Sequence, residues 1–238
     1  LSYGDAMAVN TNSKKQRKRA PLTKERVLRT AVALADKIGI GSLSMRRLGQ
    51  ALGVEAMSLY KHVSNKEDIL DGIVDLVVAE IDLPTVDDDW KSAIRRRATS
   101  AHAVLMRHPW VTMLLVSRAN VGPAMLSYVD ATIGCLREAG FSYTMADHAW
   151  NAVDSYVYGF TLQKLNFPFQ PEDYQAAAKG FLPQLPAGQY RYLRGLSEQV
   201  IGGQHDGLHD LQFGLDLIIN GLEELRQRHE QTRAGSQR

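Results

Sequence analysis

Apolar residues recur every three or four positions over most of the chain, and no stretch shows the alternation typical of a half-buried strand. The first periodic segment starts after Thr23, a residue suited to cap a helix, and stops at Gly39. A second run is capped by Ser44 and stopped by Gly53, and a third follows at once over residues 55–62. The spacing therefore predicts three short helices near the N-terminus, the last two joined by a sharp turn.

These last two segments have the layout of a helix-turn-helix. Their inward positions are Leu43, Leu48, Leu52, Val54, Leu59 and Val63. The polar and bulky residues between them have no place in so small a core, so we expect them to point outward: Met57, Ser58, Tyr60, Lys61 and His62. A hydroxyl, a phenol, an ammonium and an imidazole on one exposed helix suit base edges and phosphates in a major groove.

Helical periodicity continues to the C-terminal region. The sequence Ser64-Asn65-Lys66-Glu67 predicts a capping box that opens a helix over 65–81, which Pro84 closes. Further helices are expected over 89–107, 109–115, 123–139, 144–165, 189–201 and 210–231. Residues 166–188, rich in proline and glycine, are expected to form a loop with one helical turn. The predicted fold is all-α.

Charge divides the chain into two parts. Residues 14–66 hold 13 Lys and Arg against 3 Asp and Glu, although the whole chain carries only +2. This asymmetry indicates a polyanion-binding N-terminal part and a neutral-to-acidic C-terminal part. We expect a disordered basic arm over 1–20, a helix-turn-helix domain over 21–66, a second helical domain over 67–231 and a disordered tail over 232–238.

The single cysteine, Cys135, excludes an intrachain disulfide and fits a reducing compartment. No apolar run approaches the roughly 18–20 residues that a membrane span needs, so no membrane partner is expected. The sequence is therefore expected to be cytoplasmic.

The sequence from Thr23 to Lys66, which includes LSMRRLGQALGVEAMSLYKHVSNK at 43–66, resembles the TetR family of bacterial transcriptional repressors. The resemblance covers about 23–165 and 206–228, and is again strong in FGLDLIINGLEEL at 213–225. It implies a homodimer that binds double-stranded operator DNA through its N-terminal helices. It also implies a four-helix bundle built from 147–165 and the last helix, and a small-molecule effector pocket in each C-terminal domain.

Carried over position by position, the resemblance implies DNA contacts in the helix-turn-helix and at the start of the following helix. The predicted set is Ser44, Met45, Arg46, Ala56, Met57, Ser58, Tyr60, Lys61, His62 and Lys66. At Met45, Ala56 and Met57 the side-chain chemistry differs from that of the tetracycline-responsive members, so their operator sequence does not carry over.

The predicted effector site comprises Arg97, Trp110, Met113, Leu114, Arg118, Met125, Tyr128, Trp150, Asp154 and Gln163. Tetracycline-responsive members bind their drug with Mg²⁺, but here Leu115 stands at the position of the metal-binding histidine and Gln163 at that of the distal carboxylate. Too few oxygen ligands remain for an octahedral ion, so no metal and no cofactor are expected. Arg97 and Arg118 instead suit a carboxylate or phenolate on a mainly apolar effector.

Other interpretations remain open at this point. The helix-turn-helix could be an ordinary helical hairpin, and the aromatic and methionine residues could belong to a core. A ligand-independent architectural DNA-binding protein would need no pocket. A helical enzyme is the third alternative, although the chain lacks a phosphate-binding glycine loop, HExxH and G-x-S-x-G. His148 and Tyr158, considered as acid/base groups, do not share a helical face.

Overall fold

The computed structural model describes residues 21–85, 89–169, 173–186, 188–205 and 209–235. Every regular element within these ranges is helical, which confirms the predicted all-α fold. The elements are α1 (Lys24–Ile38), η1 (Ile40–Ser42), α2 (Met45–Leu52), α3 (Ala56–Leu59), α4 (Lys66–Val78), α5 (Trp90–Arg107), α6 (Val111–Ser117), α7 (Pro123–Glu138), α8 (Tyr143–Leu165), α9 (Tyr174–Phe181), η3 (Leu182–Gln184), α10 (Arg191–Ile201) and α11 (Leu211–Gly235). No helix in the described ranges combines the length and apolarity that a membrane crossing requires.

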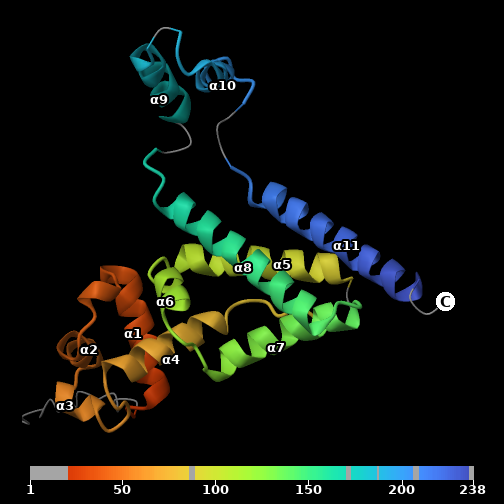
Figure 1. The fold of residues 1–238 in the computed structure, drawn as a ribbon. Helices are drawn as coiled ribbons and strands as arrows, with labels where there is room; N and C mark the ends of the chain where they lie inside the picture. The colour runs from red at the N-terminus through yellow and green to blue at the C-terminus, as the bar shows by residue number, and fades with distance from the viewer. Residues whose placement is uncertain (1–20, 86–88, 170–172, 187, 206–208, 236–238) are drawn as a thin grey trace, which may run out of the picture.

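Helices α1 to α3 form a small head at one end of the molecule, with α4 leading from it into the larger body (Figure 1). The head is built on fully buried apolar side chains, including Val27, Leu48 and Leu59, and α4 contributes Ile73 to the same core. The predicted caps are present: the Thr23 hydroxyl accepts from the Arg26 N–H and the Ser44 hydroxyl from the Arg47 N–H. The local sequence therefore determines where α1 and α2 begin.

The body packs α5, α7 and α8 together, and α11 lies along α8 (Figure 1). Its core includes Trp90 of α5, whose ring meets Phe141 edge-on at 4.9 Å between centroids. Cys135 has a free thiol and is buried in α7. Helices α9 and α10 pack against each other on an extension that stands away from this body (Figure 1).

Several predicted boundaries are wrong. Helix α3 ends at Leu59, so Tyr60 to His62 lie in a turn rather than in a helix. Asn65, not Ser64, caps α4: its side chain accepts from the Asp68 N–H, while the Asp68 carboxylate accepts from the Ser64 N–H. The cap is thus one residue further along than predicted, and the Asp68 carboxylate accepts from the residue before the cap rather than from the cap itself as in a capping box.

Later in the chain, α4 ends at Val78 rather than near 81, and α6 begins at Val111 rather than at Pro109. The predicted loop over 166–188 contains the eight-residue helix α9, since the alanines of YQAAAKGF favour a helix between flanking prolines. Helix α11 continues to Gly235, beyond the predicted end at 231. The predicted basic arm over 1–20 and residues 236–238 of the predicted tail lie outside the described residues.

Candidate nucleic-acid interface and effector site

The turn between α2 and α3 depends on two glycines. Gly53 adopts φ 68° and ψ 36°, a left-handed conformation that ends α2, and its N–H bonds to the Gln50 carbonyl at 3.2 Å. Gly49 lies against the next helix: a Cβ there would be 2.8 Å from the Val54 carbonyl oxygen and 3.2 Å from the Ala56 nitrogen. The two short helices can cross this closely only because Gly49 has no side chain.

Leu59 anchors this unit with 0 % exposure, and its neighbours in sequence face outward. Met57 is 75 % exposed and Tyr60 is 47 % exposed, and Lys61 is also exposed. Ala56, Ser58 and His62 are half-buried. The structure therefore leaves a thioether, a phenol and an ammonium exposed to solvent in the head.

Helix α2 and the start of α4 hold the other predicted contact residues. Arg46 is exposed on α2, Met45 is half-buried, and Ser44 is exposed although its hydroxyl is occupied by the cap. Lys66 is exposed at the first residue of α4. The prediction omitted Arg47, which is exposed and donates to the Ser42 carbonyl at 3.1 Å; the Arg46-Arg47 pair in the sequence was the signal for it.

The body contains a buried polar cluster made by α5, α7 and α8. The Arg97 side chain is 0 % exposed and its Nη1 lies 2.8 Å from Asp154 Oδ1. Arg97 also donates to the Tyr128 hydroxyl. Asp154 accepts further hydrogen bonds from Tyr128 at 2.9 Å, from the Trp150 indole at 2.7 Å and from Tyr158 at 3.3 Å. One carboxylate thus holds together four donor side chains from three helices.

The charges in this cluster follow from its burial. Burial raises the pKa of the Tyr128 and Tyr158 hydroxyls well above the usual value, so both stay neutral donors. Burial by itself would lower the pKa of Arg97, but Tyr128 and the Asp154 carboxylate outweigh it and raise that pKa. Arg97 Nε and Nη2 have no hydrogen-bond partner among the described residues. The cluster therefore pairs one cation with one anion and keeps unused N–H donors.

Comparison with known proteins gives the family. Residues 27–73 match the family model of bacterial regulatory proteins of the tetR family, and residues 83–226 match that of the tetracyclin repressor-like C-terminal domain. The chain belongs to the TetR family. The family match confirms the resemblance drawn from the helix-turn-helix.

Similar proteins of known name are also transcriptional repressors or members of the TetR family. The chain is 31 % identical over 217 residues to the HTH-type transcriptional repressor DrrR1 of Streptomyces coeruleorubidus, covering 86 % of this chain and 78 % of that one. It is 30 % identical over 210 residues to the class C tetracycline repressor protein of Escherichia coli, covering 86 % and 92 %. The crystal structure of the TetR-family protein ActR of Streptomyces coelicolor in complex with actinorhodin matches with a TM-score of 0.73, at 28 % identity, covering 87 % and 99 %.

The structure brings together only part of the predicted effector site of this TetR-family chain. Arg97, Tyr128, Trp150 and Asp154 meet in the buried cluster, and the prediction missed Tyr158, one helical turn after Asp154. Leu114 and Met125 are half-buried against the core. Tyr158 was accessible to sequence analysis, because positions four apart share a helix face.

Four other predicted members have no printed contact with this cluster, and their place in an effector site stays a prediction. Arg118 is paired with Glu67 and Asp71 of α4, so it is not a free counter-charge. Trp110 donates its indole N–H to Asp36 of α1 at 2.7 Å. Met113 is 57 % exposed, and Gln163 is exposed near the end of α8. A helix places side chains around its whole circumference, so sequence alignment alone could not assign these to one face.

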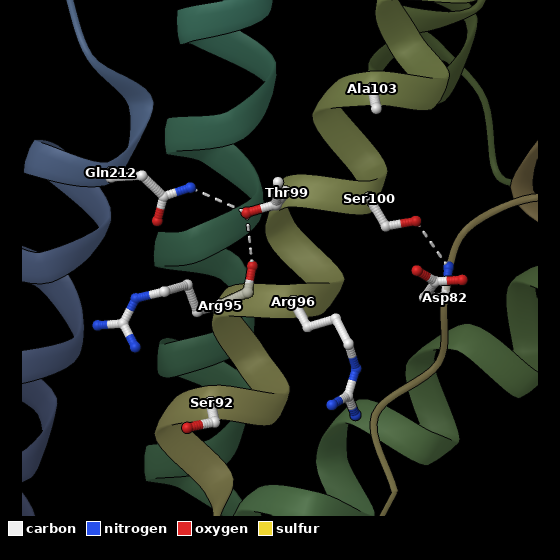
Figure 2. A pocket seen from close by; sticks show the side chains of 8 residues that line it. All are labelled: Asp82, Ser92, Arg95, Arg96, Thr99, Ser100, Ala103 and Gln212. Atoms are coloured by element: carbon white, nitrogen blue, oxygen red, sulfur yellow. Dashed lines mark hydrogen bonds between the residues drawn. The ribbon is translucent and has the colours of Figure 1, made fainter.

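A groove of about 550 Å³ lies on the outer side of α5 (Figure 2). Its lining residues are Asp82, Ser92, Arg95, Arg96, Thr99, Ser100, Ala103 and Gln212. Figure 2 shows that they bond to one another: Gln212 donates to Thr99 at 3.0 Å, and the Asp82 N–H donates to Ser100 at 2.9 Å. Arg95 is paired with Asp216 at 2.5 Å. This groove shares no residue with the predicted effector site.

Residues that could hold a metal ion are not gathered anywhere in the described ranges. No group of three or more His, Cys, Asp or Glu side chains within them has a suitable arrangement.

Proposed function

We propose that this TetR-family chain is a ligand-responsive transcriptional repressor, which binds a pseudo-palindromic operator as a homodimer and is released by a small, mainly apolar effector. The observation that carries the proposal is the exposed surface of Tyr60, Lys61 and Arg46 above the close α2–α3 contact. A surface of this kind suits a major groove, and two-fold symmetry matches half-sites one helical turn apart, about 34–36 Å. Such a protein acts in the compartment that holds the DNA, the cytoplasm.

The effector is proposed to bind beside the Arg97 cluster in the body. Two nitrogens of a fully buried guanidinium, Nε and Nη2, have no hydrogen-bond partner among the described residues, and such unsatisfied groups cost about 1–3 kcal/mol each. An oxygen acceptor on the effector would satisfy them, and the rings of Tyr128 and Trp150 would contact its apolar part. ActR, which binds actinorhodin, supports a small-molecule site in this body.

Dimerisation is proposed through α8 and α11. Helix α11 exposes large apolar side chains, with Phe213 at 70 %, Leu217 at 62 % and Leu225 at 53 %. A shallow groove on the same helix is lined by Leu217, Ile218, Gly221 and Leu222 among others. An apolar stripe of this breadth on a single surface helix favours burial against a partner.

DNA binding is tested by selecting a duplex from a random pool with the wild-type protein and measuring its dissociation constant against salt concentration. Lys66→Ala should weaken all duplexes alike and reduce the salt slope by about 1. Arg46→Ala and Tyr60→Phe should weaken the selected duplex. Arg29→Ala is the matched control, since Arg29 is exposed on α1 and paired only with Glu25. Normal binding by all three interface variants would show that their assigned roles are wrong.

Effector binding is tested by thermal shift with a panel of aromatic carboxylic acids and phenols, followed by release of the selected duplex. Release should correspond to a coupling free energy of about 1–3 kcal/mol. It should persist in a chelator, because Leu115 stands where the tetracycline-responsive members have their metal-binding histidine. An architectural DNA-binding protein would bind the duplex but none of the panel. An inducer that retains its full potency against Arg97→Met and Trp150→Ala would place the site elsewhere.

A further inference from the structure

A second polar cluster lies where the head meets the body. Asp36, near the end of α1, accepts a hydrogen bond from the Trp110 indole at 2.7 Å, and its Oδ1 also lies 2.7 Å from His108 Nδ1. His108 and Trp110 are 8 % and 9 % exposed and stand immediately before α6. One carboxylate of the DNA-binding head thus holds two nearly buried ring nitrogens of the body.

The same corner reaches the end of α4. Arg107 donates to Glu80 at 2.7 Å, and His108 Nε2 lies 3.4 Å from the same carboxylate. His108 therefore lies between Asp36 of the head and Glu80. Glu80 follows α4, the helix that joins the head to the body. The other end of α6 is held by Arg118, which bonds Glu67 at 2.5 Å and Asp71 at 2.7 Å in the first turns of α4.

These contacts differ in strength. Glu67 and Asp71 have side chains 62 % and 56 % exposed, and ion pairs with such exposed partners contribute little because water screens them. The Asp36 side chain is 32 % exposed and accepts from two nearly buried groups, and hydrogen bonds from such groups to a charged acceptor are stronger. If Asp36 moved away, the Trp110 N–H would lose its partner in a buried position. The α1 contact is therefore the stiffer of the two attachments of α6.

We propose that Asp36, His108 and Trp110 form a latch that sets the angle of the DNA-binding head on the body directly through α1, so that a displacement of α6 turns the head. Helix α1 shares a buried core with α2, α3 and α4 and carries the recognition surface with it. The three latch residues are positioning residues and touch neither DNA nor effector. The effect of this latch on operator binding rests on the proposed function.

The latch is tested by the distance between spin labels on the head and the body. Labels are placed at Gln50→Cys on α2 and Asp130→Cys on α7, both exposed positions, in a Cys135→Ala background. Excess unlabelled protein ensures that any dimer carries one labelled chain. The parent should give one narrow distribution, and Asp36→Ala should broaden it. Trp110→Phe should also broaden it, since it removes the N–H and keeps a ring.

Two controls separate a latch from a general loss of structure. Asp36→Asn retains an oxygen acceptor for Trp110 and should keep the narrow distribution. Glu25→Ala removes an exposed α1 carboxylate paired only with Arg29 and should change nothing. An unchanged distribution in both Asp36→Ala and Trp110→Phe would overturn the latch. This measurement needs no DNA, so it decides the latch even if the chain binds no duplex.

The functional consequence is measured as the dissociation constant for the selected duplex. If the latch holds the head in its binding orientation, Asp36→Ala should raise the dissociation constant about 3- to 10-fold, since affinity falls with the competent fraction. Asp36→Asn should stay within about twofold of the wild type by the same relation. Broadened distances with unchanged affinity in Asp36→Ala would reject the control of operator binding by the latch.

Discussion

At the scale of single residues, the buried pair Arg97–Asp154 shows what a charge needs inside a protein. The guanidinium is fully removed from solvent, and the carboxylate that faces it is itself held by donors from α7 and α8. Desolvation opposes such a pair, and Coulomb attraction with good hydrogen bonding compensates for it. Removing one member leaves the other charge buried without its opposite charge.

Arg97→Met should therefore lower the free energy of unfolding by about 3–5 kcal/mol in urea denaturation. The double variant Arg97→Met, Asp154→Leu should recover only part of this loss: no unpaired charge remains, but Tyr128, Trp150 and Tyr158 lose the acceptor that Asp154 provided. Arg95→Met is the matched control on the same helix: its pair with Asp216 is 36 % and 52 % exposed, so its loss should cost about 0–1 kcal/mol. Equal costs for the two single variants would contradict this account of the cluster.

Asp68 gives a pH prediction. Its bond with Lys24, followed by the Ser64 N–H, lowers the carboxyl pKa below 3.8. A lowered folded-state pKa contributes stability that is present above the unfolded value and lost as pH falls through the folded value. Between about pH 5 and pH 3 the wild type should thus lose more unfolding free energy than Asp68→Asn, measured in urea. Equal losses of unfolding free energy in the two proteins would show that Asp68 does not contribute to the loss of stability in acid.

At the scale of elements, the helix-turn-helix depends on a backbone-to-backbone approach. Helix α3 has only four residues and ends at Leu59, too short to hold its position by its own hydrogen bonds. It is held by Leu59 in the core and by contact with α2 at Gly49. The orientation of the recognition surface is therefore a property of the α2–α3 pair.

Gly49→Ala should disturb that pair. The new Cβ would meet the Val54 carbonyl oxygen at 2.8 Å, and backbone cannot move aside as a flexible side chain can. We expect a loss of about 1–3 kcal/mol in unfolding free energy, typical of overpacking, together with weaker binding of the selected duplex. Gly41→Ala is the control, because nothing lies within 4 Å of its added Cβ. Normal DNA binding by Gly49→Ala would show that the crossing tolerates a side chain.

At the scale of the whole molecule, the chain has a basic head, a body with a buried polar cluster and an apolar face on α11. The head joins the body through α4, whose apolar side chains continue one buried core into the body, and through the Arg118 pairs and the Asp36 corner.

The α11 face gives the prediction at this scale. Leu217→Glu should yield monomer or aggregate in sedimentation at micromolar concentration, because a carboxylate would replace an apolar side chain in the proposed bundle. Leu126→Glu on α7 is the control: Leu126 is 57 % exposed on a helix outside the proposed bundle, so this variant should remain dimeric. If the Leu217→Glu protein remained dimeric, the dimer interface would lie outside this face of α11.

The sequence alone determined the features that depend on near neighbours. Periodicity predicted the all-α class, capping residues predicted the starts of α1 and α2, and Gly39 and Gly53 predicted their ends. The outward position of Tyr60 and Lys61 followed from the small number of inward positions. These are local consequences of helix geometry, so a linear pattern contains them.

Only the tertiary structure decided which distant residues meet. Arg97 and Arg118 were equivalent candidates in the sequence, yet one is buried against Asp154 and the other pairs with α4. Trp110 was predicted to line the same effector site as Trp150, and its indole bonds Asp36, far away along the chain. Partners depend on how helices are rotated and stacked against one another, and that is set by the summed packing of the whole core rather than by the residues concerned.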